Sequence, residues 1–264
     1  MKIGFIGLGN MASAMIGGML SKGVAASNQI IGSARREETL RRVVETYGIQ
    51  VTTDNVEVAA QADILILAVK PQFLAEVIMQ IRDVVGEKTL VISIAAGKSM
   101  EWLEACFDGP VKLIRSMPNT PALVMEGCSG ICRNVMVTEP EIKQAIAIME
   151  SFGIVKEVPE SMMDAVMAVS GSAPAYIFMV IEAMADGAVA AGMPRDQAYQ
   201  FAAQTVLGSA RMVLETGKHP GELKDMVCSP GGTTIEAVKV LEKRGLRSAI
   251  MEGMEACIRK GKQL

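Results

Sequence analysis

Short apolar runs alternate with amphipathic stretches over residues 1 to about 160, and no other feature of the chain limits the possible folds as strongly. The apolar runs are KIGFI (2–6), QIIGS (29–33), ADILILAV (62–69), TLVISIA (89–95) and VKLIRS (111–116). Between them lie helix-like stretches such as 36–48 and 72–85. Strands rich in Val, Ile and Leu that alternate with helices predict a parallel sheet covered by helices on both faces.

The first apolar run belongs to a longer uncharged stretch, IGFIGLGNMASAMIGGML (3–20), which follows a single lysine. A secretory signal peptide is one interpretation, since Ala12-Ser13-Ala14 resembles a cleavage site. However, five glycines interrupt the stretch, and glycine costs about 1 kcal/mol per residue inside a helix. Because strands follow downstream, we interpret the stretch as a strand, a glycine turn and a helix.

Composition and charge narrow the functional classes. The chain has 264 residues, half of them hydrophobic, and a net charge of −3, which gives no reason to expect nucleic acid or an anionic membrane surface as a partner. Beyond the opening, we expect no apolar stretch near the roughly 20 residues of a membrane helix. The five cysteines form no CxxC pair, which favours reduced thiols in a cytoplasmic protein. Cys128 and Cys132 have no histidine near them, so we expect no metal site.

The strand pattern ends near Pro159. Before it, we expect a strand over 126–135, a helix over 139–153 closed by Gly153, and a last strand over 154–158. After it, the predicted elements are helices only: 175–193, 194–217, 232–245 and 246–262. We therefore expect two domains, 1–160 and 161–264. Several of the later helices are apolar on more than one face, which predicts that a second subunit covers them.

Residues 7–12 match the G-x-G-x-x-G/A fingerprint of dinucleotide-binding proteins, after a predicted strand and at the start of a helix. Gly7 permits the tight turn, Gly9 lets backbone approach a pyrophosphate, and Ala12 allows close packing of helix and sheet. The N–H groups at the helix start, around Asn10 and Met11, would receive the phosphates. The alternative is a glycine-rich turn without a ligand. The fold class expected is an α/β N-terminal Rossmann-type dinucleotide-binding domain followed by an all-α domain.

The end of the second strand bears on which dinucleotide binds. NAD sites place an acid there, whereas this chain has Ser33, Arg35 and Arg36. A hydroxyl and guanidinium groups suit a 2′-phosphate, so we expect NADP, with NADPH preferred over NADH and Arg35 as the main contact. The alternative is that the two arginines only pair with Glu37 and Glu38 on an exposed helix start.

Two further segments, AVKPQ (68–72) and SIAAGKS (93–99), fall at the carboxyl ends of predicted strands, where ligands bind in open α/β sheets. Small residues there leave room for a flat ring. Either segment could also be an ordinary turn, and Lys70 only a surface charge. The residues expected to contact the cofactor in these segments are Ala68, Val69, Lys70, Pro71, Ala95, Ala96 and Gly97.

The helical half offers one further anion site. SPGGTTIEA (229–237) is a glycine-rich loop that leads into a helix, and its N–H groups suit a single carboxylate. A helix cap by Thr233 or Thr234 is a compatible alternative. Conventional acid–base groups are scarce, because His219 is the single histidine of the chain.

These motifs carry a family resemblance. GFIGLGNM, AVKPQ, SIAAGKS, RSMPNTPA (115–122), VSGSAPAYIF (169–178) and LKDMVCSPGGTTIEAVKVLE (223–242) resemble pyrroline-5-carboxylate reductases, in order along nearly the whole chain. The SPGGTT and RxMPNTP blocks are specific to that family. GxGxxA alone is shared with 6-phosphogluconate and hydroxyacid dehydrogenases.

The resemblance implies that NAD(P)H gives hydride to 1-pyrroline-5-carboxylate and yields L-proline, the last step of proline synthesis. It also implies a homodimer with interleaved helical domains, often assembled into decamers. By position, Asn55 would touch the cofactor, and the Thr234 hydroxyl would sit by the ring nitrogen as the candidate catalytic group. The implied substrate-binding residues are Ser229, Gly231, Gly232, Thr233 and Thr234.

Two rival functions stay open at this point. Another imine reductase, or a hydroxyacid dehydrogenase of the 6-phosphogluconate dehydrogenase type, is the first, and the dehydrogenase would need a lysine base. Lys218, Lys224 and Lys239 are the candidates, and none lies in a matching motif. A non-catalytic NADP-sensing protein is the second, and it predicts binding without turnover.

Overall fold

The computed structural model describes residues 1–263 and divides into two compact units. The first comprises Met1–Ser172 together with the residues from Cys257 onward, and the second comprises Ala173–Ala256. The division thus falls twelve residues after the expected boundary at 160, and the chain end joins the first unit. Each unit is described separately below.

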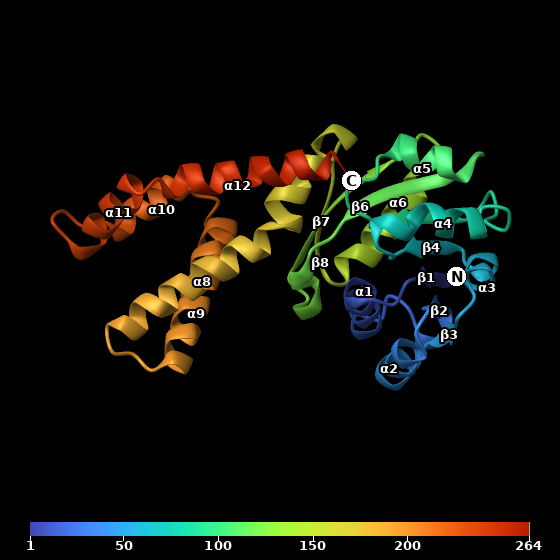
Figure 1. The fold of residues 1–264 in the computed structure, drawn as a ribbon, viewed down its shortest axis with the longest axis horizontal. Coiled ribbons are helices and arrows are strands. Elements are labelled where there is room, and N and C mark those ends of the chain that lie inside the picture. Colours follow the sequence, from blue (N-terminus) through green and yellow to red (C-terminus); the bar gives the residue numbers. More distant parts are fainter. Residues whose placement is uncertain (264) are drawn as a thin grey trace. The chain divides into compact units, whose positions relative to one another are not determined.

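A single sheet forms the centre of the first unit (Figure 1). Within the described residues its order is β3-β2-β1-β4-β5-β6-β7-β8, which begins with the 3-2-1-4-5-6 order of dinucleotide-binding folds. The strands are β1 (Ile3–Ile6), β2 (Ile30–Ser33), β3 (Gln50–Thr52), β4 (Ile64–Leu67), β5 (Leu90–Ser93), β6 (Lys112–Met117), β7 (Gly127–Arg133) and β8 (Gly153–Glu157).

The predicted parallel pairing is confirmed for every neighbouring pair except β6 and β7, which run antiparallel. A parallel partner needs a crossover of a dozen or more residues. The connection from β6 to β7 holds only the short 3₁₀ helix η2 (Thr120–Val124), so the chain turns back beside β6. The three-residue β3 has no counterpart among the predicted runs.

Helices cover both faces of this sheet (Figure 1). The side chains of β1 alternate between the faces: Ile3 and Phe5 pack in the cluster that includes α1, α2 and α6, while Ile6 packs in the cluster of α3, α4 and α5. The helices are α1 (Asn10–Ser21), α2 (Glu37–Tyr47), α3 (Asn55–Gln61), α4 (Pro71–Ile81), α5 (Met100–Phe107) and α6 (Glu139–Glu150). The prediction that Gly153 closes the 139–153 helix is wrong, because α6 ends at Glu150 and Gly153 opens β8.

After Glu157 the described residues form helices and no strands, which confirms the expected change of class. The helix α9 ends at Thr216, and the following Gly217 has a φ of +64°, which suits a left-handed cap. The elements are η3 (Glu160–Met162), α7 (Met163–Val166), the π-helix η4 (Met167–Gly171), α8 (Ala173–Ala190), α9 (Arg195–Thr216), α10 (Pro220–Val227), α11 (Thr233–Lys243) and α12 (Leu246–Gly261).

One helical run corrects an expectation. The stretch Glu160–Ala190 is long and apolar enough, by length and composition alone, to cross a membrane, although the sequence led us to expect no such stretch beyond the opening. Most of its apolar window is exposed in the isolated chain, with 17% buried. A single helix of this kind is weak evidence for a membrane, because an exposed apolar helix also serves as a protein interface.

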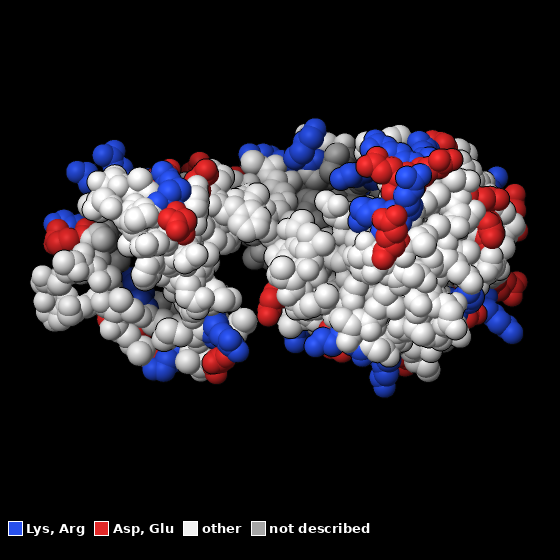
Figure 2. Space-filling view, turned by 90° about the horizontal axis from the view of Figure 1, so that it is seen from below, with Lys and Arg blue, Asp and Glu red and all other residues white. Residues whose placement is uncertain are grey.

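The second unit has almost no core of its own. Among its residues only Ala185, Ala198, Ala202 and Leu223 are buried apolar side chains. Large apolar side chains stay exposed along its helices, for example Phe178 (61%) and Leu214 (78%). Wide uncharged areas separate the charged side chains in Figure 2. Three buried alanines and one leucine cannot offset the conformational entropy of more than 80 ordered residues, so this unit needs a partner surface.

Candidate active site

The glycine turn between β1 and α1 contains two glycines with different roles. Gly7 has φ +96°, and a Cβ there would lie 2.8 Å from the carbonyl oxygen of Ala68 at the end of β4. Gly9 is the N-cap of α1 with an ordinary φ of −79°, and a Cβ there would meet nothing within 4 Å. The fold itself therefore requires glycine at position 7. At position 9 glycine leaves open space in front of the helix start.

A cavity of about 300 Å³ lies at this turn, at the carboxyl ends of β1, β2 and β4. This is the edge at which open α/β sheets bind nucleotides. Among the predicted cofactor residues, the cavity brings together Gly7, Gly9, Ser33, Arg35, Asn55, Ala68, Val69 and Lys70. The open space at Gly9 and the basic residues after β2 fit a dinucleotide phosphate.

Several predicted residues lie elsewhere. Ala12 is buried in the core beneath the turn, which agrees with its expected packing role. Ala95 is buried in the core cluster of α3, α4 and α5, and Pro71 is the first residue of α4. The predicted cofactor residues outside the lining of this cavity are Asn10, Met11, Ala12, Pro71, Ala95, Ala96 and Gly97.

The Ser33 hydroxyl, which was expected to face a 2′-phosphate, is buried and bonds to another side chain. Ser33 is fully buried, and its Oγ donates a hydrogen bond of 2.7 Å to Oδ1 of Asn55. The Asn55 Nδ2 in turn donates to Oε1 of Gln80 at 2.8 Å. The Ser33 hydroxyl therefore orients Asn55, which stands at the first position of α3 and lines the cavity.

Arg35 extends into solvent at the rim of the cavity. Its Nη2 lies 3.1 Å from Oε1 of Glu76, and its Cζ lies 5.0 Å from the centre of the Phe73 ring. The alternative that Arg35 pairs with Glu37 or Glu38 is wrong, because its partner comes from α4.

The sequence did not single out several residues of this site. Arg42 of α2 donates from Nη2 to the carbonyl oxygen of Leu8 at 3.3 Å, which places a positive charge behind the glycine turn. Phe73 and Val77 of α4 line the cavity together with Leu8, Ala34 and Thr39. The i, i+4 spacing of Phe73 and Val77, after the AVKPQ motif, is the signal that could have identified the α4 pair.

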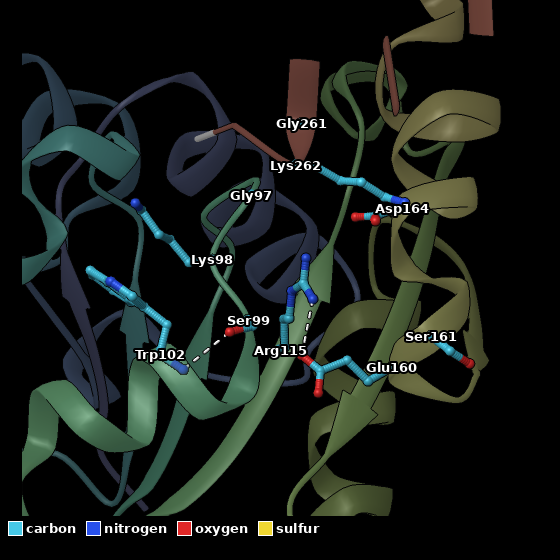
Figure 3. A pocket seen from close by; sticks show the side chains of 10 residues that line it. All are labelled: Gly97, Lys98, Ser99, Trp102, Arg115, Glu160, Ser161, Asp164, Gly261 and Lys262. Carbon is cyan, nitrogen blue, oxygen red and sulfur yellow. Dashed lines mark hydrogen bonds and ion pairs between the residues drawn. The ribbon is translucent and has the colours of Figure 1, made fainter. Parts of the chain in front are cut away.

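A second, larger cavity of about 650 Å³ lies beside the Gly97 loop (Figure 3). Arg115 of β6 donates to Glu160 at 3.0 Å, and Glu160 also accepts from the Met100 N–H at 2.6 Å. Lys98 lies 4.6 Å from the centre of the Trp102 ring. Of the predicted site residues, only Gly97 borders this cavity. Three further lining residues, Lys98, Ser99 and Arg115, belong to the SIAAGKS and RSMPNTPA motifs but were not predicted as site residues. The lining is Gly97, Lys98, Ser99, Trp102, Arg115, Glu160, Ser161, Asp164, Gly261 and Lys262.

The predicted substrate loop leads into α11 of the helical unit. Gly232 is the N-cap of α11 and accordingly forms no side-chain cap, so the predicted cap by Thr233 or Thr234 is wrong. Both threonines lie within the first turn instead. The loop is a tight turn: the Gly232 N–H donates to the Ser229 carbonyl at 3.0 Å, and Gly231 has φ +68°. The start of α11 therefore presents backbone N–H groups beside two glycines, as an anion site requires.

The lysines available to the rival dehydrogenase lie beside carboxylates. Lys218 pairs with Glu222 at 2.7 Å, and Lys239 lies 3.6 Å from Glu236. The hydrogen bond to Asp225 raises the pKa of Lys224. A lysine that acts as a general base needs a lowered pKa, so the surroundings of Lys224 do not favour that chemistry.

The cysteines are free thiols in the described structure. Burial raises the pKa of Cys128, and it raises the pKa of Cys132 to about 11. A thiol with a raised pKa is a poor nucleophile and a poor metal ligand at neutral pH. Both side chains therefore fit a packing role.

The sheet order, the glycine turn and the arginine after β2 together define a Rossmann-type dinucleotide-binding protein. Comparison with known families agrees: residues 2–97 match the family described as NADP oxidoreductase coenzyme F420-dependent, and residues 160–264 match pyrroline-5-carboxylate reductase dimerisation. These matches support NADP as the cofactor and assembly into oligomers.

The particular family follows from full-length similarity. The chain is 48% identical to the pyrroline-5-carboxylate reductase of Escherichia coli K12, over 100% of this chain and 98% of that protein. Its fold is similar to that of the Coxiella burnetii reductase, with a TM-score of 0.91, 37% identity and coverage of 99% and 97%. The Plasmodium falciparum enzyme, solved with NADP bound, gives a TM-score of 0.90, 32% identity and coverage of 99% and 97%. The chain belongs to the pyrroline-5-carboxylate reductase family.

Proposed function

We propose that the protein reduces 1-pyrroline-5-carboxylate to L-proline with a hydride from NADPH, as the last step of proline synthesis. The full-length similarity to reductases of this name supports the proposal over the dehydrogenase and the sensing protein. The observation that carries it within the structure is the start of α11, where two glycines precede a helix without a side-chain cap. Such a start suits the single carboxylate of the substrate.

The residues around the glycine turn would hold the cofactor. The first turn of α1, with Gly9 as its N-cap, faces the pyrophosphate, and Arg42 adds positive charge behind the turn. Arg35 would hold the 2′-phosphate, and Asn55, which Ser33 orients, would hold the cofactor from the cavity wall. When bound, the cofactor supplies the hydride that reduces the C=N bond.

Thr234 is the proposed catalytic residue. When hydride adds to the imine carbon, the electron pair of the C=N bond moves to nitrogen. An iminium substrate thereby becomes a neutral amine, whereas a neutral imine must also gain a proton. The half-buried Thr234 hydroxyl, in the first turn of α11, orients the ring in both cases and donates to nitrogen in the second. Ser229, Gly231, Gly232 and Thr233 shape the pocket around the substrate carboxylate.

The assembly proposed is a homodimer with interleaved helical domains, with decamers as the expected higher form. The exposed apolar side chains of the helical unit and its match to a dimerisation domain support it. A cytoplasmic location fits the free cysteines.

One assay tests the proposed function against both rivals. Purified protein is mixed with NADPH and 1-pyrroline-5-carboxylate, the loss of reduced cofactor is followed by absorbance, and the product is identified as proline by chromatography. A parallel panel offers NADP⁺ with 2-hydroxy and 3-hydroxy acids. Turnover of a hydroxy acid but not of the imine would support the dehydrogenase, and cofactor binding without any turnover would support the sensing protein.

The cofactor preference has its own test. Arg35→Ala should weaken NADPH binding by about 1.5–3 kcal/mol, the scale of a hydrogen bond to a charged group, and leave NADH binding unchanged. Equal losses for both cofactors would show that Arg35 does not read the 2′-phosphate.

A further inference from the structure

The arginine expected to bind the 2′-phosphate already has an acidic partner in this chain. Arg35 lies between the Phe73 ring and the Glu76 carboxylate, and both belong to α4. Phe73 lines the nucleotide cavity, so this pair stands at the cavity rim. A carboxylate therefore occupies the region that a 2′-phosphate must approach.

A chain of hydrogen bonds fixes this carboxylate in place. Ser33 holds Asn55, Asn55 holds Gln80, and the Gln80 Nε2 donates to Oε1 of Glu76 at 3.4 Å. The same Glu76 oxygen pairs with Arg35. These hydrogen bonds run from the end of β2 through the start of α3 to α4. They connect Ser33 and Asn55, two predicted cofactor contacts, to Glu76.

We propose that Glu76 is a specificity-determining residue that limits the preference for NADPH over NADH. Its carboxylate competes with the 2′-phosphate for Arg35 and repels that phosphate by like charge. A ribose 2′-hydroxyl in the same place instead donates a hydrogen bond, which the carboxylate accepts. Sites selective for NAD usually carry an acid at the end of the second strand, and here α4 supplies one from outside the fingerprint. The inference rests on the proposed contact between Arg35 and the 2′-phosphate.

The expected effect is modest because the pair is accessible to water. The side chains of Arg35 and Glu76 are 66% and 55% exposed. Exposed ion pairs change an equilibrium by about fivefold at most. Removal of the Glu76 charge should therefore tighten NADP⁺ binding by about two- to fivefold.

Two substitutions in the full-length protein separate the two roles of the carboxylate. Dissociation constants for NADP⁺ and NAD⁺ are measured by calorimetry. Glu76→Gln keeps an acceptor oxygen, so NADP⁺ should bind about two- to fivefold more tightly while NAD⁺ is unchanged. Glu76→Ala also removes the acceptor, and NAD⁺ should bind about two- to tenfold more weakly. The matched control is Glu87→Gln, which removes one exposed charge just before β5, at the amino ends of the parallel strands and so away from the carboxyl ends where the cavity lies.

The background of Arg35→Ala decides the interpretation. There the carboxylate has no arginine to hold, so any tightening of NADP⁺ binding by Glu76→Gln measures the like-charge repulsion alone, and loss of the tightening shows that competition for Arg35 carries the effect. One combination of results would overturn this inference and leave the proposed function intact. In it, Arg35→Ala weakens the binding of NADP⁺ but not of NAD⁺, while Glu76→Gln leaves the ratio of the two affinities unchanged. Equal tightening in Glu87→Gln would overturn it as well. Absence of reduction of 1-pyrroline-5-carboxylate by the native protein would instead overturn the proposed function.

Discussion

Two alanine substitutions in the glycine turn, at positions 7 and 9, should have different consequences for stability and for cofactor binding, although each adds a single methyl group. Gly7 has φ +96°, and its new Cβ would lie 2.8 Å from the Ala68 carbonyl oxygen. Gly9 has φ −79° and ψ −171°, and its new Cβ would meet no protein atom within 4 Å. Gly7→Ala should therefore damage the fold, while Gly9→Ala should spare the fold and obstruct the cofactor.

The magnitudes follow from these contacts. In Gly7→Ala, left-handed backbone costs about 1–2 kcal/mol for a non-glycine residue, and overpacking against backbone adds about 1–3 kcal/mol. The free energy of unfolding should thus fall by about 2–5 kcal/mol. In Gly9→Ala, the loss of a favourable N-cap lowers stability, whereas the reduced freedom of the unfolded chain raises it. The free energy of unfolding should therefore change by no more than about 1 kcal/mol. NADP⁺ affinity should nevertheless fall by about 10- to 100-fold, the equivalent of one hydrogen bond to a charged group.

Urea unfolding and NADP⁺ titration of each variant provide the two measurements. Gly48→Ala is the matched control, because Gly48 has φ +63° at the end of α2 and open space around its Cβ position. It should lose about 1 kcal/mol of stability from backbone strain alone and keep its cofactor affinity. Native-like NADP⁺ binding by Gly9→Ala would refute the assigned position of the pyrophosphate, and equal destabilisation of Gly7→Ala and Gly48→Ala would refute the clash at Ala68.

Three further outcomes are expected. Thr234→Ala should lower turnover and leave NADPH affinity intact; a loss of about 10²–10⁴-fold that shrinks at low pH indicates proton donation, and a pH-independent loss near 1 kcal/mol indicates orientation alone. Light scattering at micromolar concentration should find a dimer or larger, and a stable monomer would contradict the proposed assembly. Burial alone would raise the pKa of Glu141, but hydrogen bonds from Lys112 and Thr138 outweigh it and lower that pKa. The carboxylate therefore stabilises the fold above its unfolded pKa, so Glu141→Gln should cost about 1 kcal/mol in urea unfolding at pH 7, and this difference should vanish as the pH falls through the folded pKa.

The sequence predicted those parts of the fold and site that depend on neighbouring residues. The strands β1, β4 and β5 are short runs that are buried throughout and rich in Ile, Leu and Val, and the glycine turn is a local pattern with one structural solution. The strand over 126–135 was predicted and is β7, but its antiparallel direction was missed because that direction depends on the length of the preceding connection. Phe73 and Glu76 were missed because their role depends on contact with Arg35, about 40 residues away in the chain.

The exposed apolar run Glu160–Ala190 could contact either a membrane or a protein partner, and the two require different distributions of charged side chains. A membrane helix places apolar side chains against lipid on all sides, and an ionisable group near its centre is costly. The α8 part of the run carries Glu182 and Asp186 one turn apart, and Asp186 pairs with Arg195 of α9. Its small residues allow close approach of another helix, while Phe178 and Met179 supply apolar area. Large apolar side chains are exposed at consecutive positions of α8 (Ile177, Phe178, Met179 and Val180) and so point to several sides of the helix. A helix that is apolar on more than one side is buried against other protein, in agreement with the dimerisation domain that residues 160–264 match. Because the helical unit buries so few side chains by itself, its folding and its association should be linked, and the stability of the whole protein should rise with its concentration.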